Sequence, residues 1–173
     1  MDPFAHLASG ALLGRAVRPT GEAWPAFALF GLAAGIAPDV DAPLALFGAD
    51  VWGRWHQLFT HSLVGLLWVP LGLSLLPFRF APWRTRFALA LGGWTLHVVL
   101  DLVARWPVPV AWPASDEKWA LLLLVRDFSW TIDMLLVVGL ALTLWDPARP
   151  HARWIAVTTA LIVAGWLMAG LPT

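Results

Sequence analysis

The chain has 173 residues, of which 60% are hydrophobic and 13% charged, with a formal net charge of zero. That hydrophobic share is well above the ~45–50% of soluble domains, so we expect one membrane-embedded domain over residues 1–173. No cysteine is present, which excludes disulfides and thiolate metal sites, and no basic run indicates a nucleic-acid partner.

Six apolar segments follow in chain order, and they predict an all-α integral membrane protein. The first two are short, since ~14 residues at 1.5 Å per residue reach only ~21 Å of a ~30 Å hydrocarbon core. A stretch from Trp119 to Val125 is too short to span, and we interpret it as an interfacial turn of helix. The six segments cover Phe4–Val17, Trp24–Ala37, Leu58–Phe78, Arg86–Ala104, Trp130–Trp145 and Trp154–Leu171.

Histidine and aspartate residues gather at one membrane face when these segments alternate across the bilayer. Arginine and lysine are more numerous in the loops of the opposite side, and this bias marks the cytoplasmic side. We therefore expect a multi-pass protein whose candidate site faces away from the cytoplasm. Ionisable side chains are costly in such a chain, so their convergence predicts one shared site. The residues at this face are His6, Asp39, Asp41, His56, His61, His97, Asp101, Asp127 and Asp133.

The spacing of His97 and Asp101 favours metal binding. Four residues apart on a helix, they project from the same face and can hold one ion. Asp39 and Asp41 follow Pro38, and we expect a tight turn from which one or both carboxylates reach the metal. Imidazole and carboxylate ligands suit zinc, with manganese or iron as alternatives, and one or two ions would fit.

The sequence does not fix the positions of His56 and His61, and it leaves the role of His6 open. His56 and His61 are five residues apart, too far around a helix to share a face, so one of them precedes the helix or uses its first turn. His6 lies on a stripe with Gly10 and Gly14, and small residues at that spacing let helices pack closely. A simple hydrogen-bonded packing role remains an alternative for His6 taken alone.

Six motifs follow one another along the chain, namely His6, Pro38–Asp41, His56–Ser62, His97–Asp101, Trp112–Ser115 and Ile132–Asp133. Their order resembles that of a known family, the YdjM-like proteins, which are described as LexA-binding, inner-membrane-associated, metal-dependent hydrolases. The resemblance spans about residues 4–135 and implies a location in the bacterial inner (cytoplasmic) membrane. The position after the first histidine of the third motif is commonly Arg in that family and is Gln57 here. Binding of an anionic substrate would then fall to Arg54 or Arg105.

A more distant similarity is to zinc-dependent phospholipases C and the related single-strand nucleases. That similarity implies that His97 and Asp101 share one ion with Asp41 or Asp39 and with His56 or His61. It also implies that His6 and Asp101 contribute to a second ion. The metal ligands predicted on this basis are His6, Asp41, His56, His61, His97 and Asp101.

We therefore predict a metal-dependent hydrolase of a phosphoester in a membrane lipid or lipid-linked substrate, with metal-activated water as the nucleophile. A spare carboxylate, Asp39 or Asp133, would serve as general base. The alternative is a non-enzymatic metal-binding membrane protein, either an ion transporter or a scaffold or regulatory tether. Ion flux into proteoliposomes would separate a transporter from a hydrolase. The residues expected to bind substrate are Arg54, Arg105, Trp112, Ser115 and Asp127.

Overall fold

The computed structural model describes residues 3–19, 22–103, 106–120, 134, 136–141 and 159. Within these ranges the chain is helical, as predicted, and its only extended pairing is an isolated bridge between Val108 and Trp119. Most of the two predicted segments at 130–145 and 154–171 lies outside the described residues. The helices are α1 (Pro3–Val17), α2 (Trp24–Ile36), the 3₁₀ helix η1 (Ala37–Phe47), α3 (Ala49–Trp55), α4 (Leu63–Leu75) and α5 (Trp83–Val103).

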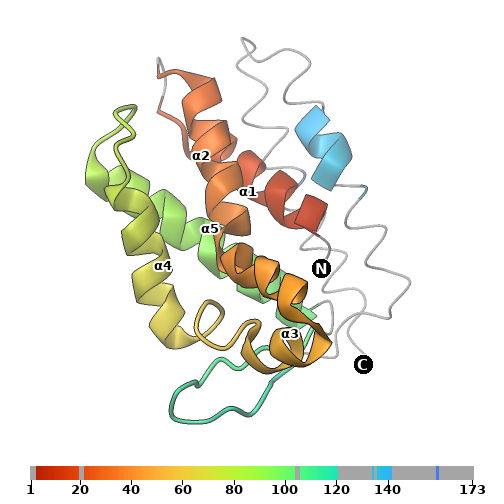
Figure 1. Ribbon diagram of the computed structural model, residues 1–173. Coiled ribbons are helices and arrows are strands. Elements are labelled where there is room, and N and C mark those ends of the chain that lie inside the picture. The colour runs from red at the N-terminus through yellow and green to blue at the C-terminus, as the bar shows by residue number, and fades with distance from the viewer. Residues whose placement is uncertain are drawn as a thin grey trace, which may run out of the picture.

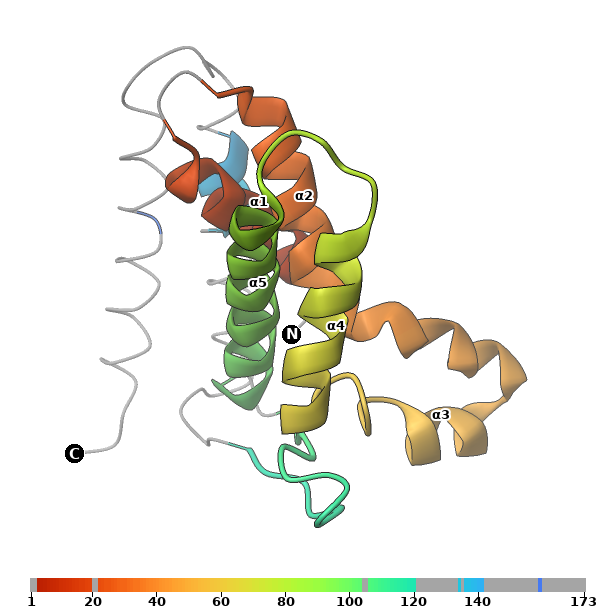
Figure 2. The same cartoon turned by 90° about the vertical axis from the view of Figure 1, so that its left-hand side faces the viewer.

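Helix α5 is the centre of the described bundle. It packs against α1, α2 and α4, and its contacts extend to η1 (Figure 1). The η1–α3 segment bends away from the four longer helices and forms an arm that projects from the bundle (Figure 2). Its first part, η1, contacts both α4 and α5.

Two helical stretches of the described residues are long and apolar enough to cross a membrane. One runs from Trp24 to Phe47 over 24 residues, and the other from Trp83 to Val103 over 21 residues. The first corrects our expectation of a short second segment that ends in a tight turn, because α2 continues directly into η1. Pro38 is compatible with this continuation, since it lies in the first turn of η1, where its missing N–H is not required.

Helix α4, which corresponds to the third predicted segment (Leu58–Phe78), begins later than predicted. Residues 56–62 form turns, and α4 starts at Leu63 because Ser62 caps it, with the Gly65 N–H donating to Ser62 Oγ at 3.3 Å. Helix α5, in contrast, begins three residues earlier than Arg86, at Trp83.

The predicted interfacial helix turn at Trp119 is wrong. Trp119 and Val108 exchange backbone hydrogen bonds of 2.8 and 2.9 Å, so Trp119 is held in an extended bridge rather than a helix. The rest of that predicted turn, residues 121–125, lies outside the described residues.

Helices α1 and α2 meet backbone to backbone along a seam of glycines. A Cβ added at Gly10 would overlap the carbonyl oxygen of Gly31, and one added at Gly35 would overlap that of His6. Gly14 makes the same close approach to the backbone of Phe27. The close packing that the Gly10/Gly14 spacing predicts is therefore confirmed, and it brings the His6 turn of α1 against the end of α2.

Candidate metal centre

Four side-chain atoms from three parts of the chain converge at the end of α5. The Nε2 atoms of His61 and His97 lie 3.1 Å apart. Asp101 Oδ2 is 3.5 Å from the first and 3.4 Å from the second, and Asp39 Oδ1 is 3.6 Å from both. A tetrahedral zinc ion with bonds of about 2.0–2.1 Å separates its ligand atoms by about 3.3 Å. The donor types and their spacing therefore fit such an ion.

A backbone carbonyl at the end of α2 sets the orientation of the His97 ring. Its Nδ1 lies 2.6 Å from the carbonyl oxygen of Gly35, which can only accept a hydrogen bond, so Nδ1 carries the proton. This leaves the lone pair of Nε2 directed toward His61. Two imidazole nitrogens at 3.1 Å need a proton or a cation between them, because two lone pairs at that distance repel.

His6 joins the cluster from α1. Its ring stacks on that of His97, with centroids 3.6 Å apart and planes 18° apart. Its Nε2 is 3.1 Å from Asp101 Oδ1, so the two oxygens of this carboxylate face different imidazoles. His6 Nδ1 is buried without a hydrogen-bond partner. His6, Asp39 and His97 also have ligand atoms close enough together to share an ion.

Burial is nearly complete on all sides of the cluster except one. His61 and His97 are 0% exposed and Asp101 is 3% exposed, whereas the Asp39 side chain is 18% exposed. Access to the cluster is therefore from the η1 side, past Asp39. Burial lowers the pKa of the His61 imidazole in the turn before α4, which keeps this ring in the neutral, metal-binding form at pH 7.

Asp41 and His56 lie next to this cluster and bind each other. Asp41 Oδ1 is 2.8 Å from His56 Nδ1. Asp41 Oδ2 accepts the Gln57 N–H at 2.8 Å and the Thr60 hydroxyl at 3.1 Å. His56 also stacks on Trp52 of α3, with centroids 3.6 Å apart. The structure thus places Asp39 and His61 in the cluster, and Asp41 and His56 one hydrogen-bonded step behind it.

The three described residues that were predicted to bind substrate have the following environments. Arg54 is exposed on α3. Trp112 packs edge-on against Phe59 at 6.2 Å, and Ser115 Oγ accepts the backbone N–H of Glu117 at 3.1 Å. The remaining predicted substrate-binding residues and the second candidate base lie outside the described residues. They are Arg105, Asp127 and Asp133.

Two contributors to the site carry no role in the sequence prediction. Thr60 binds His61 Nδ1 through its hydroxyl at 2.9 Å, and its position directly before a motif histidine was an available signal. Gly35 contributes a backbone carbonyl, for which no side-chain pattern exists.

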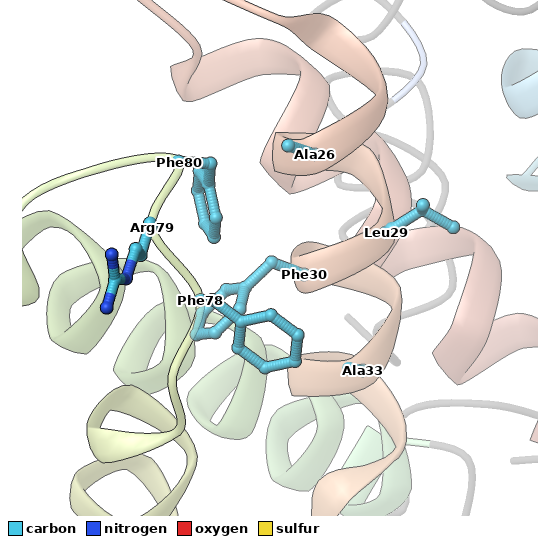
Figure 3. Close-up of a pocket in the computed structure, with 7 residues that line it drawn as sticks. All are labelled: Ala26, Leu29, Phe30, Ala33, Phe78, Arg79 and Phe80. Carbon is cyan, nitrogen blue, oxygen red and sulfur yellow. The ribbon is translucent and has the colours of Figure 1, made fainter.

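An apolar cavity lies between α2 and the α4–α5 loop. Its volume is about 370 Å³, and the rings of Phe30, Phe78 and Phe80 gather around it (Figure 3). It is formed by α2 and the α4–α5 loop, and its lining includes none of the cluster residues. Its lining residues are Ala26, Leu29, Phe30, Ala33, Phe78, Arg79 and Phe80.

Comparisons with known proteins agree with a membrane assignment. A family model described as "YdjM inner membrane protein" matches residues 1–171. A protein of Bacillus subtilis (strain 168) described as "Uncharacterized protein YfhP" is 31% identical over 139 residues, which cover 74% of this chain. The match covers 42% of that protein, so the chain spans less than half of its relative's length. No solved structure matches the chain.

Proposed function

This chain belongs to the YdjM inner membrane protein family, and on that premise we propose that it is a metal-dependent phosphoester hydrolase. Its substrate would be a membrane lipid or a lipid-linked molecule. The observation that carries the proposal is the 3.1 Å approach of two buried imidazole Nε2 atoms between two carboxylates. Such an arrangement leaves a cation-sized position surrounded by neutral nitrogen and anionic oxygen donors.

In this proposal His61, His97 and Asp101 hold the ion, which is zinc, with manganese or iron as alternatives. Three protein ligands and one open position are typical of catalytic zinc sites. The bound ion would activate a water molecule and withdraw charge from a phosphoryl oxygen. His6 either orients Asp101 through its 3.1 Å contact or contributes to a second ion.

Asp39 is the proposed general base. Its carboxylate is on the accessible side of the cluster and lies 3.6 Å from both imidazoles. From there it can accept a proton from a water molecule that enters past η1. Arg54, exposed on the neighbouring α3, is the cation in the described arm that would attract a phosphate group.

The position of the cluster supports a substrate in the membrane. Asp39 lies where α2 passes into η1, and His97 and Asp101 lie near the end of the candidate span Trp83–Val103. In this proposal that end is at headgroup depth. The arm also exposes apolar side chains, with Leu46 86% and Phe47 74% exposed, so this end of the protein suits contact with lipid. We propose that it faces away from the cytoplasm.

The test is a paired measurement of metal content and turnover. Protein purified in detergent is analysed for bound metal and then assayed for phosphate-ester release from a panel of phospholipids. We expect about one or two equivalents of zinc and measurable hydrolysis, both lost in His97→Ala/Asp101→Ala and retained in the exposed-site control Asp50→Asn. A wild-type protein that binds no zinc, manganese or iron would refute the proposal.

One observation favours a second candidate, a non-enzymatic metal-binding membrane protein. Asp39 is nearly as close to the two imidazoles as Asp101 is, at 3.6 Å against 3.4–3.5 Å. If Asp39 is a fourth ligand, the tetrahedron is closed, as in structural zinc sites. Stoichiometric metal with no turnover on any phosphoester would favour this candidate.

A further inference from the structure

We propose that Asp41 and Thr60 are positioning residues, which fix the tautomer of His61 and thereby raise the metal affinity of the cluster. The inference rests on the metal-binding function proposed above. It starts from a continuous hydrogen-bond chain that runs from the Asp41 carboxylate through the Thr60 hydroxyl to His61 Nδ1.

The direction of each bond in this chain follows from the groups themselves. An ionised carboxylate only accepts, so the single hydroxyl proton of Thr60 is directed to Asp41 Oδ2, 3.1 Å away. Thr60 Oγ1 must then act as the acceptor in its 2.9 Å contact with His61 Nδ1. His61 therefore carries its proton on Nδ1 and presents a lone pair at Nε2, the atom that faces His97 and the two carboxylates.

Asp41 is suited to this role because it is itself held in place. Its Oδ1 binds His56 Nδ1 at 2.8 Å, and its Oδ2 also accepts the Gln57 N–H at 2.8 Å. Gln57 has a φ of 73°, a left-handed conformation that is uncommon for a residue other than glycine. The bond from its N–H to Asp41 stabilises that conformation, so one carboxylate of η1 holds the turn that delivers both Thr60 and His61.

The arrangement parallels that of the second imidazole. His97 has its Nδ1 proton fixed by the Gly35 carbonyl at 2.6 Å, and His61 has it fixed by Thr60 at 2.9 Å. Both rings thus direct Nε2 lone pairs to the same position. Such outer hydrogen bonds orient metal-binding histidines, and their loss typically weakens metal affinity about 10–100-fold. Asp41 would therefore orient the ligand His61 through Thr60 and would not itself bind the ion.

Thr60→Val tests this hydrogen-bond chain, because it removes the hydroxyl at nearly constant size. Thr60→Ser is the matched control that keeps the hydroxyl. Zinc affinity is measured by competition with a chelator on detergent-purified full-length protein. We expect Thr60→Val to weaken zinc binding about 10–100-fold, with Thr60→Ser close to wild type. Asp41→Asn should shift affinity in the same direction, with Asp50→Asn as its control, which covers the case in which Thr60→Val does not fold.

A second readout separates this inference from the proposed function. Imidazole ¹⁵N spectra of the metal-free protein report the tautomer of His61 directly, and we expect Nδ1–H in wild type and a mixture in Thr60→Val. Zinc-binding wild type with unchanged affinity and tautomer in Thr60→Val would overturn the inference alone. Wild type that binds no metal would overturn both this affinity role and the proposed function.

Discussion

The carbonyl oxygen of Gly35 lies 2.6 Å from Nδ1 of His97, although 62 residues separate them in the chain. The same glycine contacts the backbone of α1 so closely that a Cβ would overlap the carbonyl oxygen of His6. One residue at the end of α2 therefore sets both the spacing of two helices and the orientation of an imidazole in the cluster.

Substitution of Gly35 by alanine should therefore affect stability and metal binding together. We expect Gly35→Ala to lower the free energy of unfolding by about 1–3 kcal/mol, because the added methyl group forces α1 and α2 apart. The control is Gly72→Ala on α4, where a Cβ meets no atom within 4 Å and helix propensity alone should add up to about 1 kcal/mol. Thermal unfolding in detergent measures both variants. Equal unfolding midpoints of Gly35→Ala and Gly72→Ala would contradict the close packing of α1 and α2 along the glycine seam.

Replacement of His61 and of His56 by glutamine should have sharply different effects on the amount of bound zinc. We expect His61→Gln to abolish stoichiometric zinc, because it removes a ligand atom 3.1 Å from His97 Nε2. His56→Gln should keep the stoichiometry and weaken affinity modestly, since His56 hydrogen-bonds Asp41, which is one step removed from the cluster. Elemental analysis after dialysis decides between them, and loss of zinc in His56→Gln alone would reverse the assignment.

Asp39→Asn should distinguish a general base from a fourth ligand. As a base, Asp39 contributes to proton transfer, so we expect bound zinc to stay and hydrolysis to fall about 10²–10⁴-fold. As a ligand, its substitution would remove zinc and turnover together. Metal content and initial rates are measured on the same preparation, with Asp50→Asn beside it. Full activity in Asp39→Asn would exclude both roles.

The metal-free protein should lose stability as the pH falls below 6.5. Burial lowers the pKa of His61 from its ordinary value of 6.5, so in that range the unfolded chain binds a proton that the folded chain does not. The contribution of His61 to stability therefore rises with pH until about 6.5 and is fully present above it. Unfolding midpoints in chelator at pH 5 and 7.5 should show this slope, and His61→Gln should reduce it. A slope unchanged in that variant would assign it to other groups.

The face of the membrane can be determined by labelling, because the chain has no native cysteine. We expect Asp116→Cys, in an exposed loop on the side of the cluster, to react with an impermeant maleimide added outside intact cells stripped of any outer membrane. Arg79→Cys, exposed in the α4–α5 loop at the opposite end, should react only after permeabilisation. The reverse pattern would place the cluster on the cytoplasmic side.

The sequence predicts best those parts of the site that depend on one helix. The spacing of His97 and Asp101 places both on one face of α5, and that of Gly10 and Gly14 produces close contact with α2. In contrast, which of two neighbouring aspartates reaches the cluster depends on how η1 continues α2. That continuation brings Asp39 to the imidazoles and turns Asp41 toward Thr60.

The boundaries that were mispredicted have local physical causes. The apolar run from Leu58 suggests one continuous helix, but the capping hydroxyl of Ser62 delays its start and leaves His61 in a turn. The orientation of His97 by a carbonyl oxygen depends on tertiary contact alone, so composition and spacing hold no information about it.

The sequence separation of 95 between His6 and Asp101 constrains the order in which the protein can fold. The α1–α2 hairpin, held by contacts between chain neighbours, can form as soon as both helices leave the ribosome. The cluster cannot, because α5 is translated last of its contributors. Until then His6 lacks the Asp101 carboxylate and Asp39 lacks the His97 imidazole that each contacts in the folded protein. The cluster can therefore close only after α5 has been made, and under the proposed function metal binding would follow that step.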